Sequence, residues 1–348
     1  MPDFISRSND AHHSAGAPAG RGRRDRLVVF ADPRSPISAV LTATALRAAR
    51  SRPEIAVVAV CDAAPQTVPS LARGALETLA ATVLERLFDP TARGFRPPAL
   101  LGSLRWSAWR HGVPFVVPQH RDVNDSRFVG RLRDELRPTM ALSLACLQIF
   151  HPALLAQFEV AVNYHNALLP AYRGLSATGW SLYHGEPRTG YAFHHMTAGV
   201  DEGPTLLSGS LPVPPDARLA EAEAAKTASA AARLGELLDL MVSRVAGTPQ
   251  SGTPSYFGRQ ACRAMICIET PETETFAELQ RRLRAFGVLV VRVAGELYEV
   301  TRLVPSSAGG AVSFRTADGV AVQATRFLSL PLHLYRLVRR IRGIVTHG

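Results

Sequence analysis

Residues 27–60 read LVVFADPRSPISAVLTATALRAARSRPEIAVVAV, and this stretch decides the fold class. Residues 27–30 are a short apolar run that ends in the turn residues Asp32, Pro33 and Pro36. Apolar residues then recur at helical spacing over 37–49, and residues 55–60 are a second buried run. A strand, a helix and a strand at this pitch predict an α/β fold with a parallel sheet. The first turn lacks a G-x-G-x-x-G motif, so the usual dinucleotide-binding fingerprint is missing.

Beyond residue 60, helices and strands are expected to alternate. The expected helical segments are 65–112, 128–136, a short turn at 152–158, and 218–245. The expected strands are 115–117, 140–146 and 160–164, followed by shorter ones at 288–293, 297–300, 312–315 and 320–325. Tight turn signals separate the last four strands, which indicates a small β-barrel or a similar antiparallel module.

The length of 348 residues allows two domains with separate cores. We expect a disordered arm at 1–26, a larger α/β domain at 27–246, a linker at 247–255 and a smaller β-rich C-terminal domain at 256–348. The linker is rich in Gly, Pro and Ser, and the last domain ends in a basic amphipathic tail. The arm has no apolar core of a secretory signal, and no apolar run reaches the ~18 residues that a membrane span needs. No membrane span is therefore expected.

The formal charge of +10 comes almost entirely from arginine, because Lys226 is the only lysine. A basic surface attracts polyanions such as nucleic acid or a phosphorylated substrate. The four cysteines form no C-x-x-C pair, and no histidine lies at zinc-ligand spacing near the last two of them. We therefore expect no metal site, and free thiols in a reducing, cytoplasmic compartment.

Residues 163–174 read NYHNALLPAYRG and carry the most informative motif of the chain. On a strand, residues two apart face the same side, so Asn163 and His165 can project together. They lie at the carboxyl end of an expected strand, which is where open α/β sheets bind their ligands. Pro170 and Gly174 favour an ordered loop after it.

These residue types suit attack of an amine on a carbonyl carbon. The attack builds a tetrahedral intermediate with a negative oxygen, and the amide of Asn163 and an imidazole N–H of His165 can donate to it. The attacking nitrogen must also lose a proton. The carboxylate of Asp201, in the sequence Gly199-Val-Asp201-Glu-Gly203, can accept that proton directly or through a water. The neighbouring glycines would let this loop fold over the site.

The segment 142–213 resembles the folate-dependent formyltransferase family, which includes glycinamide ribonucleotide transformylase, methionyl-tRNA formyltransferase and sugar N-formyltransferases. The family pattern N-x-H-x-s-L-L-P-x-Y-x-G is met by residues 163–174, and a T-G strand leading to a D-x-G loop is met by Thr189, Gly190, Asp201 and Gly203. The resemblance implies a Rossmann-like formyltransferase domain at 27–246 and a catalytic trio of Asn163, His165 and Asp201. The formyl donor would be 10-formyltetrahydrofolate, in one-carbon metabolism.

The same resemblance assigns a folate site. The segment Leu147-Gln148-Ile149-Phe150 looks like the one whose backbone receives the pterin ring, and Gly199 belongs to the loop that would close over it. His194 falls where the transformylase branch also carries a histidine, and a chemical role for it is left open. The region after residue 255 faintly resembles the C-terminal domain of the methionyl-tRNA and sugar-amine enzymes.

The acceptor is expected to be a small-molecule amine, namely an amino sugar, an amino acid or a natural-product amine. The methionyl-tRNA enzymes carry a basic inserted loop after the second strand, whereas residues 62–93 are apolar and do not resemble it. A basic C-terminal domain leaves tRNA as a possible partner, with methionyl-tRNA formyltransferase as an alternative function. Two more functions stay open: a formyltetrahydrofolate hydrolase, which uses water as acceptor, and a non-enzymatic folate- or RNA-binding module with a vestigial site.

Overall fold

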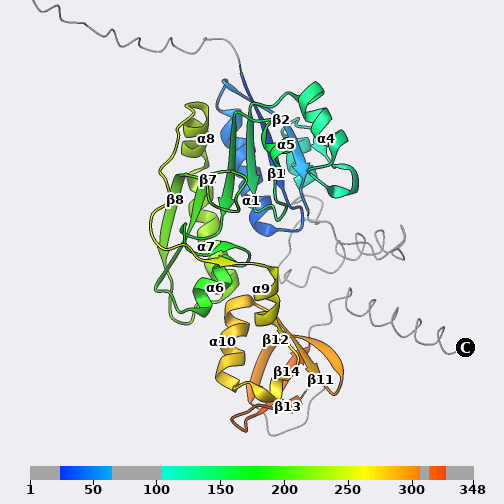
Figure 1. The fold of residues 1–348 in the computed structure, drawn as a ribbon, viewed down its shortest axis with the longest axis vertical. Coiled ribbons are helices and arrows are strands. Elements are labelled where there is room, and N and C mark those ends of the chain that lie inside the picture. The colour runs from blue at the N-terminus through cyan, green and yellow to red at the C-terminus, as the bar shows by residue number, and fades with distance from the viewer. Residues whose placement is uncertain (1–23, 65–103, 306–312, 327–348) are drawn as a thin grey trace, which may run out of the picture.

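A computed structural model of the chain describes residues 24–64, 104–305 and 313–326 (Figure 1). The expected arm up to residue 23, most of the helical segment 65–112 and the amphipathic tail lie outside the described residues. Among the described residues, no helix is long and apolar enough to cross a membrane.

A seven-stranded sheet forms the centre of the larger domain, with the strand order β3-β2-β1-β4-β5-β7-β8. Its strands are β1 (Asp25–Ala31), β2 (Ile55–Asp62), β3 (Phe115–Val116), β4 (Met140–Leu144), β5 (Val160–His165), β7 (Arg188–His195) and β8 (Thr205–Pro212). The first five are parallel, as expected, whereas β7 and β8 run antiparallel to their neighbours. The sheet is therefore mixed rather than wholly parallel, and the strand order reverses between β1 and β4.

Strand β1 shows why the sheet is buried on both faces. Leu27 and Val29 belong to one hydrophobic cluster and Val28 and Phe30 to another, as the alternation of side chains along a strand requires. All four are fully buried. Burying each such side chain stabilises the fold by roughly 1.5–3 kcal/mol relative to leaving it exposed.

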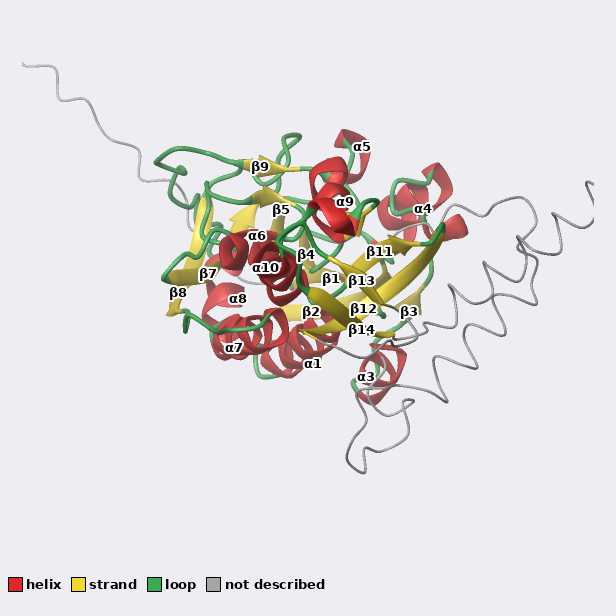
Figure 2. Ribbon diagram, turned by 90° about the horizontal axis from the view of Figure 1, so that it is seen from below, coloured by secondary structure: helices red, strands yellow, loops and turns green. Residues whose placement is uncertain are grey.

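Helices cover both faces of this sheet (Figure 2). One face packs against α1 (Pro36–Arg50), α7 (Leu219–Ala232) and α8 (Leu234–Val242). The other face packs against α4 (Ser126–Arg131), the π-helical turn Leu132–Leu136 and α5 (Pro152–Leu155). Helix α1 begins as its sequence predicts, because the Ser35 hydroxyl accepts from the backbone N–H of Ser38 and Pro36 occupies the first turn. The expected helix at 218–245 is divided in two at Arg233.

A second, five-stranded sheet lies in the C-terminal part, with the strand order β10-β11-β12-β14-β13. Its strands are β10 (Cys267–Ile268), β11 (Leu289–Val293), β12 (Glu296–Pro305), β13 (Ser313–Arg315) and β14 (Ala321–Arg326). All pairs except β10–β11 are antiparallel. The expected fold class, a Rossmann-like α/β domain with a smaller β-rich C-terminal domain, is confirmed.

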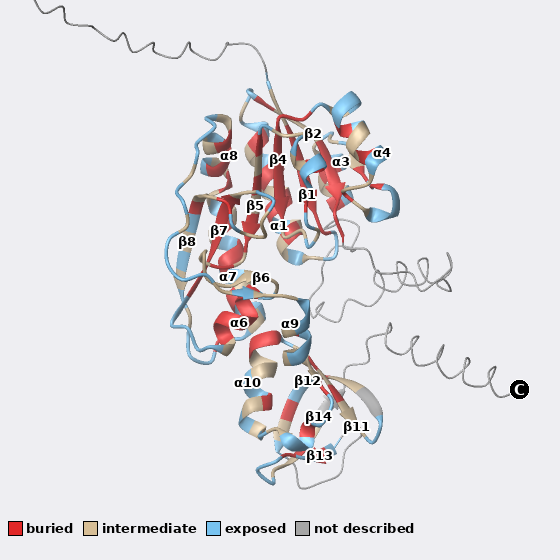
Figure 3. Cartoon of the chain, viewed as in Figure 1, coloured by how far each residue is buried: buried red, intermediate tan, exposed pale blue. Residues whose placement is uncertain are grey.

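Helices connect the two sheets, and their buried faces meet between them (Figure 3). They are α6 (Ala177–Tyr183), α9 (Arg259–Ile266) and α10 (Phe276–Phe286); the short α3 (Leu104–Arg110) lies instead against α1. At Gly179 on α6, an added Cβ would lie 2.8 Å from the ring of Phe286, so only glycine allows α10 to approach so closely. The indole of Trp180 stacks on Phe257, with ring centroids 4.1 Å apart. These contacts place the region after residue 255 directly against the larger domain.

Candidate active site

Strand β5 carries Asn163 and His165 to the carboxyl edge of the sheet. It runs parallel to β4 on one side and antiparallel to β7 on the other, and His194 of β7 lies opposite Asn163. The segment after β4, residues 147–150, emerges at the same edge because β4 and β5 are parallel. This edge lies on the side of the sheet where α/β proteins bind ligands.

Asp201 reaches this edge from the loop between β7 and β8. Its backbone adopts the left-handed conformation, with φ at 54°, which aspartate tolerates better than most residues. At Gly203 an added Cβ would collide with the carbonyl of His195, so the loop cannot turn back toward β8 with a larger residue there. At Gly199 a Cβ would collide with the side chain of Glu202.

The carboxylate of Asp201 forms the centre of the site. Its Oδ1 lies 3.4 Å from Nδ2 of Asn163 and 3.4 Å from Nε2 of His194. Its Oδ2 lies 3.4 Å from Nδ1 of His165 and accepts the backbone N–H of Gly174 at 2.8 Å. The structure thus brings the three predicted catalytic residues together with His194, although their catalytic roles remain a prediction.

The two histidines are oriented by backbone carbonyls. Nε2 of His165 donates to the carbonyl of Tyr172 at 2.8 Å, and Nδ1 of His194 donates to the carbonyl of His195 at 2.8 Å. In a neutral His194, Nε2 is then an acceptor, and Nδ2 of Asn163 donates to it at 3.2 Å. The N–H of His165 that we expected to face an oxyanion is therefore bonded to Tyr172 in this structure.

Burial and charge set the protonation states of the site. Burial opposes ionisation of Asp201, but its side-chain contact with His194 and the proximity of His165 outweigh it and hold the pKa of Asp201 at about 2. Burial lowers the pKa of His165, and the charge of Asp201 acts in the opposite direction. At neutral pH the carboxyl group of Asp201 is therefore ionised.

The segment expected to receive the pterin ring contains both exposed and buried side chains. Leu147 and Ile149 are each 57% exposed, whereas Phe150 is buried against Phe30 in the core. The side chain of Gln148 braces the loops around it, since its amide donates to the carbonyls of Ala64 and Arg121 at 2.9 Å each. Two apolar side chains are thus exposed at this edge of the sheet, and the assignment of the segment to folate remains a prediction.

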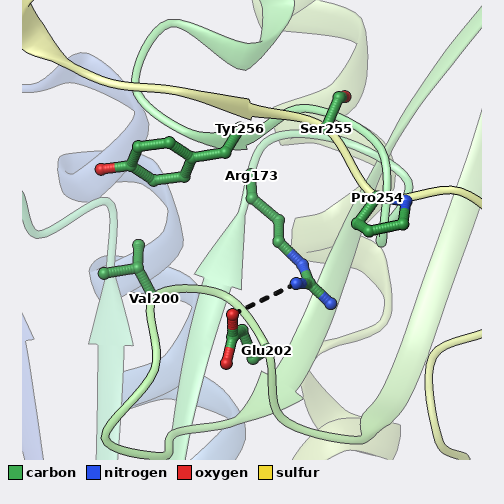
Figure 4. Close-up of a pocket in the computed structure, with 6 residues that line it drawn as sticks. All are labelled: Arg173, Val200, Glu202, Pro254, Ser255 and Tyr256. Atoms are coloured by element: carbon green, nitrogen blue, oxygen red, sulfur yellow. Dashed lines mark hydrogen bonds and ion pairs between the residues drawn. The ribbon is translucent and has the colours of Figure 1, made fainter.

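A pocket of about 400 Å³ opens beside the Asp201 loop (Figure 4). Its walls come from the loop after β5, the Asp201 loop and the segment before β9 (Tyr256–Phe257), and its lining residues are Arg173, Val200, Glu202, Pro254, Ser255 and Tyr256. Arg173 and Glu202 form an ion pair at 3.4 Å on its wall. The residues on either side of Asp201 in the chain, Val200 and Glu202, thus line the pocket.

One buried residue near the site was not anticipated from the sequence. The ammonium of Lys226, on α7, is fully buried and donates to the carbonyl of Asn166 at 2.8 Å and to the hydroxyl of Thr178 at 2.6 Å. Burial lowers the pKa of Lys226 to about 7, although the charge of Glu223 opposes the change. The only signal in the sequence was that this lysine stands alone in an alanine-rich helix.

The described residues offer no site for a metal ion. No group of three or more His, Cys, Asp or Glu side chains among them is arranged to ligate one. All four cysteines are described, and none forms a disulfide. Burial raises the pKa of the Cys146 thiol to about 12, so this thiol near the folate segment is not a nucleophile at neutral pH.

The fold, a Rossmann-like α/β sheet followed by a smaller β-rich part, is that of a Rossmann-like formyltransferase. Residues 108–233, which contain the whole trio, match the formyl transferase family. This match confirms the resemblance of the chain to the folate-dependent formyltransferases that the sequence indicated.

Several known proteins are similar to the chain. A methionyl-tRNA formyltransferase of Trichlorobacter lovleyi is 33% identical over 172 residues, which cover 48% of this chain and 52% of the relative. The chain thus spans about half the length of the curated relatives it matches. Among solved structures, a sugar N-formyltransferase from Shewanella has a TM-score of 0.53 at 14% identity, covering 80% of this chain and 96% of that one. A 4-N formyltransferase from Francisella tularensis has a TM-score of 0.55 at 14% identity, covering 81% and 98%. At these identities the structural likeness shows the fold alone.

Proposed function

We propose that the protein transfers a formyl group from 10-formyltetrahydrofolate to an amine. The observation that carries this proposal is the convergence of Asn163, His165 and Asp201 around one buried carboxylate at the ligand-binding edge of the sheet. The exposed Leu147 and Ile149 at the same edge suit the pterin ring of the donor. When bound, the donor supplies an activated formyl carbon.

The side chains of the trio have complementary tasks in this reaction. Asn163 donates from its amide to the negative oxygen that develops on the formyl carbon, and such a donor contributes roughly 10²–10³ in rate. Asp201 stays ionised at neutral pH, so it can accept the proton that the attacking nitrogen loses and return it to the folate nitrogen as the bond from that nitrogen to the formyl carbon breaks and tetrahydrofolate leaves. His165 and His194 lie on two sides of that carboxylate, each with a ring nitrogen 3.4 Å from it, and the backbone N–H of Gly174 holds it by a 2.8 Å hydrogen bond.

The proposed acceptor is a small amine such as an amino sugar. The pocket beside Asp201 has a volume of about 400 Å³, which lies in the range of roughly 300–1,000 Å³ that is usual for small-molecule sites. Arg173 on its wall can bind an anionic group of such an acceptor, and Glu202 can accept hydrogen bonds from its hydroxyl or amine groups. Methionyl-tRNA is the second candidate acceptor, favoured by the curated relatives, which are methionyl-tRNA formyltransferases.

An acceptor screen tests the proposal. Purified protein is given 10-formyltetrahydrofolate together with a nucleotide-linked amino sugar, with charged initiator tRNA, or with no acceptor, and release of tetrahydrofolate is followed. Turnover only with the small amine supports the proposal. Turnover only with tRNA would identify methionyl-tRNA as the acceptor in place of a small amine. Equal turnover without acceptor would identify a hydrolase, and no turnover under any condition, with the folded wild-type protein, would refute formyl transfer.

A further inference from the structure

The stretch expected to be a linker returns along both loops of the candidate active site. Thr248 and Thr205 exchange a pair of backbone hydrogen bonds of 2.8 Å each at the start of β8. Further along, β9 pairs in parallel with β6 (Arg173–Gly174), which precedes α6. Figure 4 shows the backbone at Ser255 and Tyr256 passing next to Arg173. Residues 248–257 therefore form part of the walls of the site.

Within this stretch, the side chain of Gln250 uses its full hydrogen-bonding capacity on the two loops. Its Nε2 donates to the backbone carbonyls of Asp201 and Gly203, at 2.8 Å each. Its Oε1 accepts from Nη2 of Arg173 at 2.8 Å and from Nε of Arg173 at 3.3 Å. The orientation of the amide is unambiguous, since only the nitrogen can donate to carbonyls and only the oxygen can accept from a guanidinium.

These contacts connect the two backbone segments that fix the carboxylate of Asp201. Gln250 holds the carbonyl of Asp201 itself, whose φ of 54° requires support from its surroundings. It also holds Arg173, and the next residue, Gly174, donates its N–H to the carboxylate at 2.8 Å. We propose that Gln250 is a positioning residue that aligns the Asp201 carboxylate with Asn163 and His165, an inference that rests on the proposed function.

A purely structural role for Gln250 makes a different prediction. If Gln250 served only to hold Arg173, a glutamate would serve as well, because a carboxylate accepts from a guanidinium at least as strongly as an amide oxygen does. The variant Gln250→Glu keeps the size of the side chain and this acceptor, but it has no N–H for the carbonyls of Asp201 and Gly203. It separates the two interpretations more sharply than Gln250→Ala does.

The control is Gln157→Glu. Gln157 is half-buried, and its amide donates to the carbonyl of Ala153 one turn earlier, so this change adds the same charge away from the site. The expected result is that kcat falls about 10- to 100-fold in Gln250→Glu and in Gln250→Ala, because a displacement of about 1 Å in a reacting group can cost that much. Dissociation constants for 5-formyltetrahydrofolate should stay within about twofold of the wild type, and Gln157→Glu should behave like the wild type.

A second measurement needs no turnover. The ring ¹⁵N signals of His165 and His194 report their hydrogen bonds, and Asp201 contacts both rings. Displacing Asp201 should move both signals in Gln250→Glu and neither in Gln157→Glu, with assignments from His165→Gln and His194→Gln.

The two measurements keep the proposals separate. A wild-type protein without turnover refutes formyl transfer, and the ring signals then decide the role of Gln250. Wild-type turnover together with a kcat of Gln250→Glu within twofold of the wild type, or unmoved ring signals, overturns the positioning role.

Discussion

The replacement Lys226→Met should change how the stability of the protein depends on pH. Lys226 has a pKa of about 7 in the folded protein, against an ordinary value of 10.5 that it regains on unfolding. Each pKa unit of difference corresponds to about 1.4 kcal/mol. Burying this ammonium thus costs about 4–5 kcal/mol below pH 7, and the hydrogen bonds to Asn166 and Thr178 offset part of that cost.

The sign of the pH dependence follows from proton binding. Between pH 7 and pH 10.5 the unfolded chain binds a proton at Lys226 that the folded protein has lost, so this residue makes stability rise with pH in that window. The contribution from pH 7 to pH 9 is about 2 kcal/mol. Methionine does not titrate, so the stability of the variant should lack this rise. The free energy of unfolding of the variant should therefore exceed that of the wild type by most at or below pH 7.

The assay is urea unfolding followed by tryptophan fluorescence at several pH values from 6 to 9. Trp180 reports on the relevant region, because it lies on α6 with Thr178, a partner of Lys226. The difference between variant and wild type is the informative quantity, since it removes the titration of other groups such as the buried thiols. Arg50→Met, at the exposed end of α1, controls for the loss of one cation. A difference that stays constant within about 0.5 kcal/mol from pH 6 to pH 9 would refute the assigned pKa of Lys226.

Three further outcomes are expected. Asn163→Ala should lower kcat by roughly 10²–10³ and Asp201→Asn by roughly 10²–10⁴, with the melting curve of each variant as a test of folding. Near-normal turnover of either variant would show that the replaced side chain has no role in the reaction. Millimolar 5-formyltetrahydrofolate should raise the melting temperature, because a ligand that binds only the folded state stabilises it, and an unchanged temperature would argue against folate. Asp201, with a pKa of about 2, stays ionised down to acidic pH, so the fall of the rate at acidic pH should follow protonation of the acceptor amine. Two acceptors whose amines differ in pKa should therefore lose rate at different pH values, and a fall at the same pH for both would contradict this.

The elements that the sequence predicted well are those whose pattern is local. The apolar runs of β1 and β2 and the helical spacing of α1 place these elements within a few residues of the expected bounds. Strand β8 was missed because its sequence, TLLSGSLP, has no regular alternation of apolar and polar residues, and only Leu207 in it is buried. It forms because β7 offers a partner edge, which is a tertiary effect that no local window contains.

In the candidate site, too, some features could be predicted from the local sequence and others depend on the tertiary fold. Asn163 and His165 could be placed on one face of a strand from the alternation of side chains, and Asp201 could be chosen from its glycine-flanked loop, because both inferences depend only on residue identity and spacing. The partners that fix them are largely backbone groups, such as the carbonyl of Tyr172 on His165 and the N–H of Gly174 on Asp201. Every residue has such groups, so no motif reveals which ones a fold will use. The role of Gln250 was hidden for this reason, since a Gly/Pro/Ser-rich stretch is typical of a linker.

The backbone partners also constrain how the site can work. With Nε2 of His165 donating to Tyr172, its Nδ1 can donate to Asp201 only if the ring takes up a second proton. Burial opposes that proton, whereas the carboxylate favours it. The amide hydrogens of Asn163 are likewise directed at His194 and Asp201. A developing oxyanion can therefore receive a hydrogen bond from Asn163 only if one of these two amide bonds is exchanged, and the 3.4 Å bond to Asp201 is the longer and hence the weaker of them. His165 can donate to it only by giving up its bond to Tyr172 or by taking up a second proton.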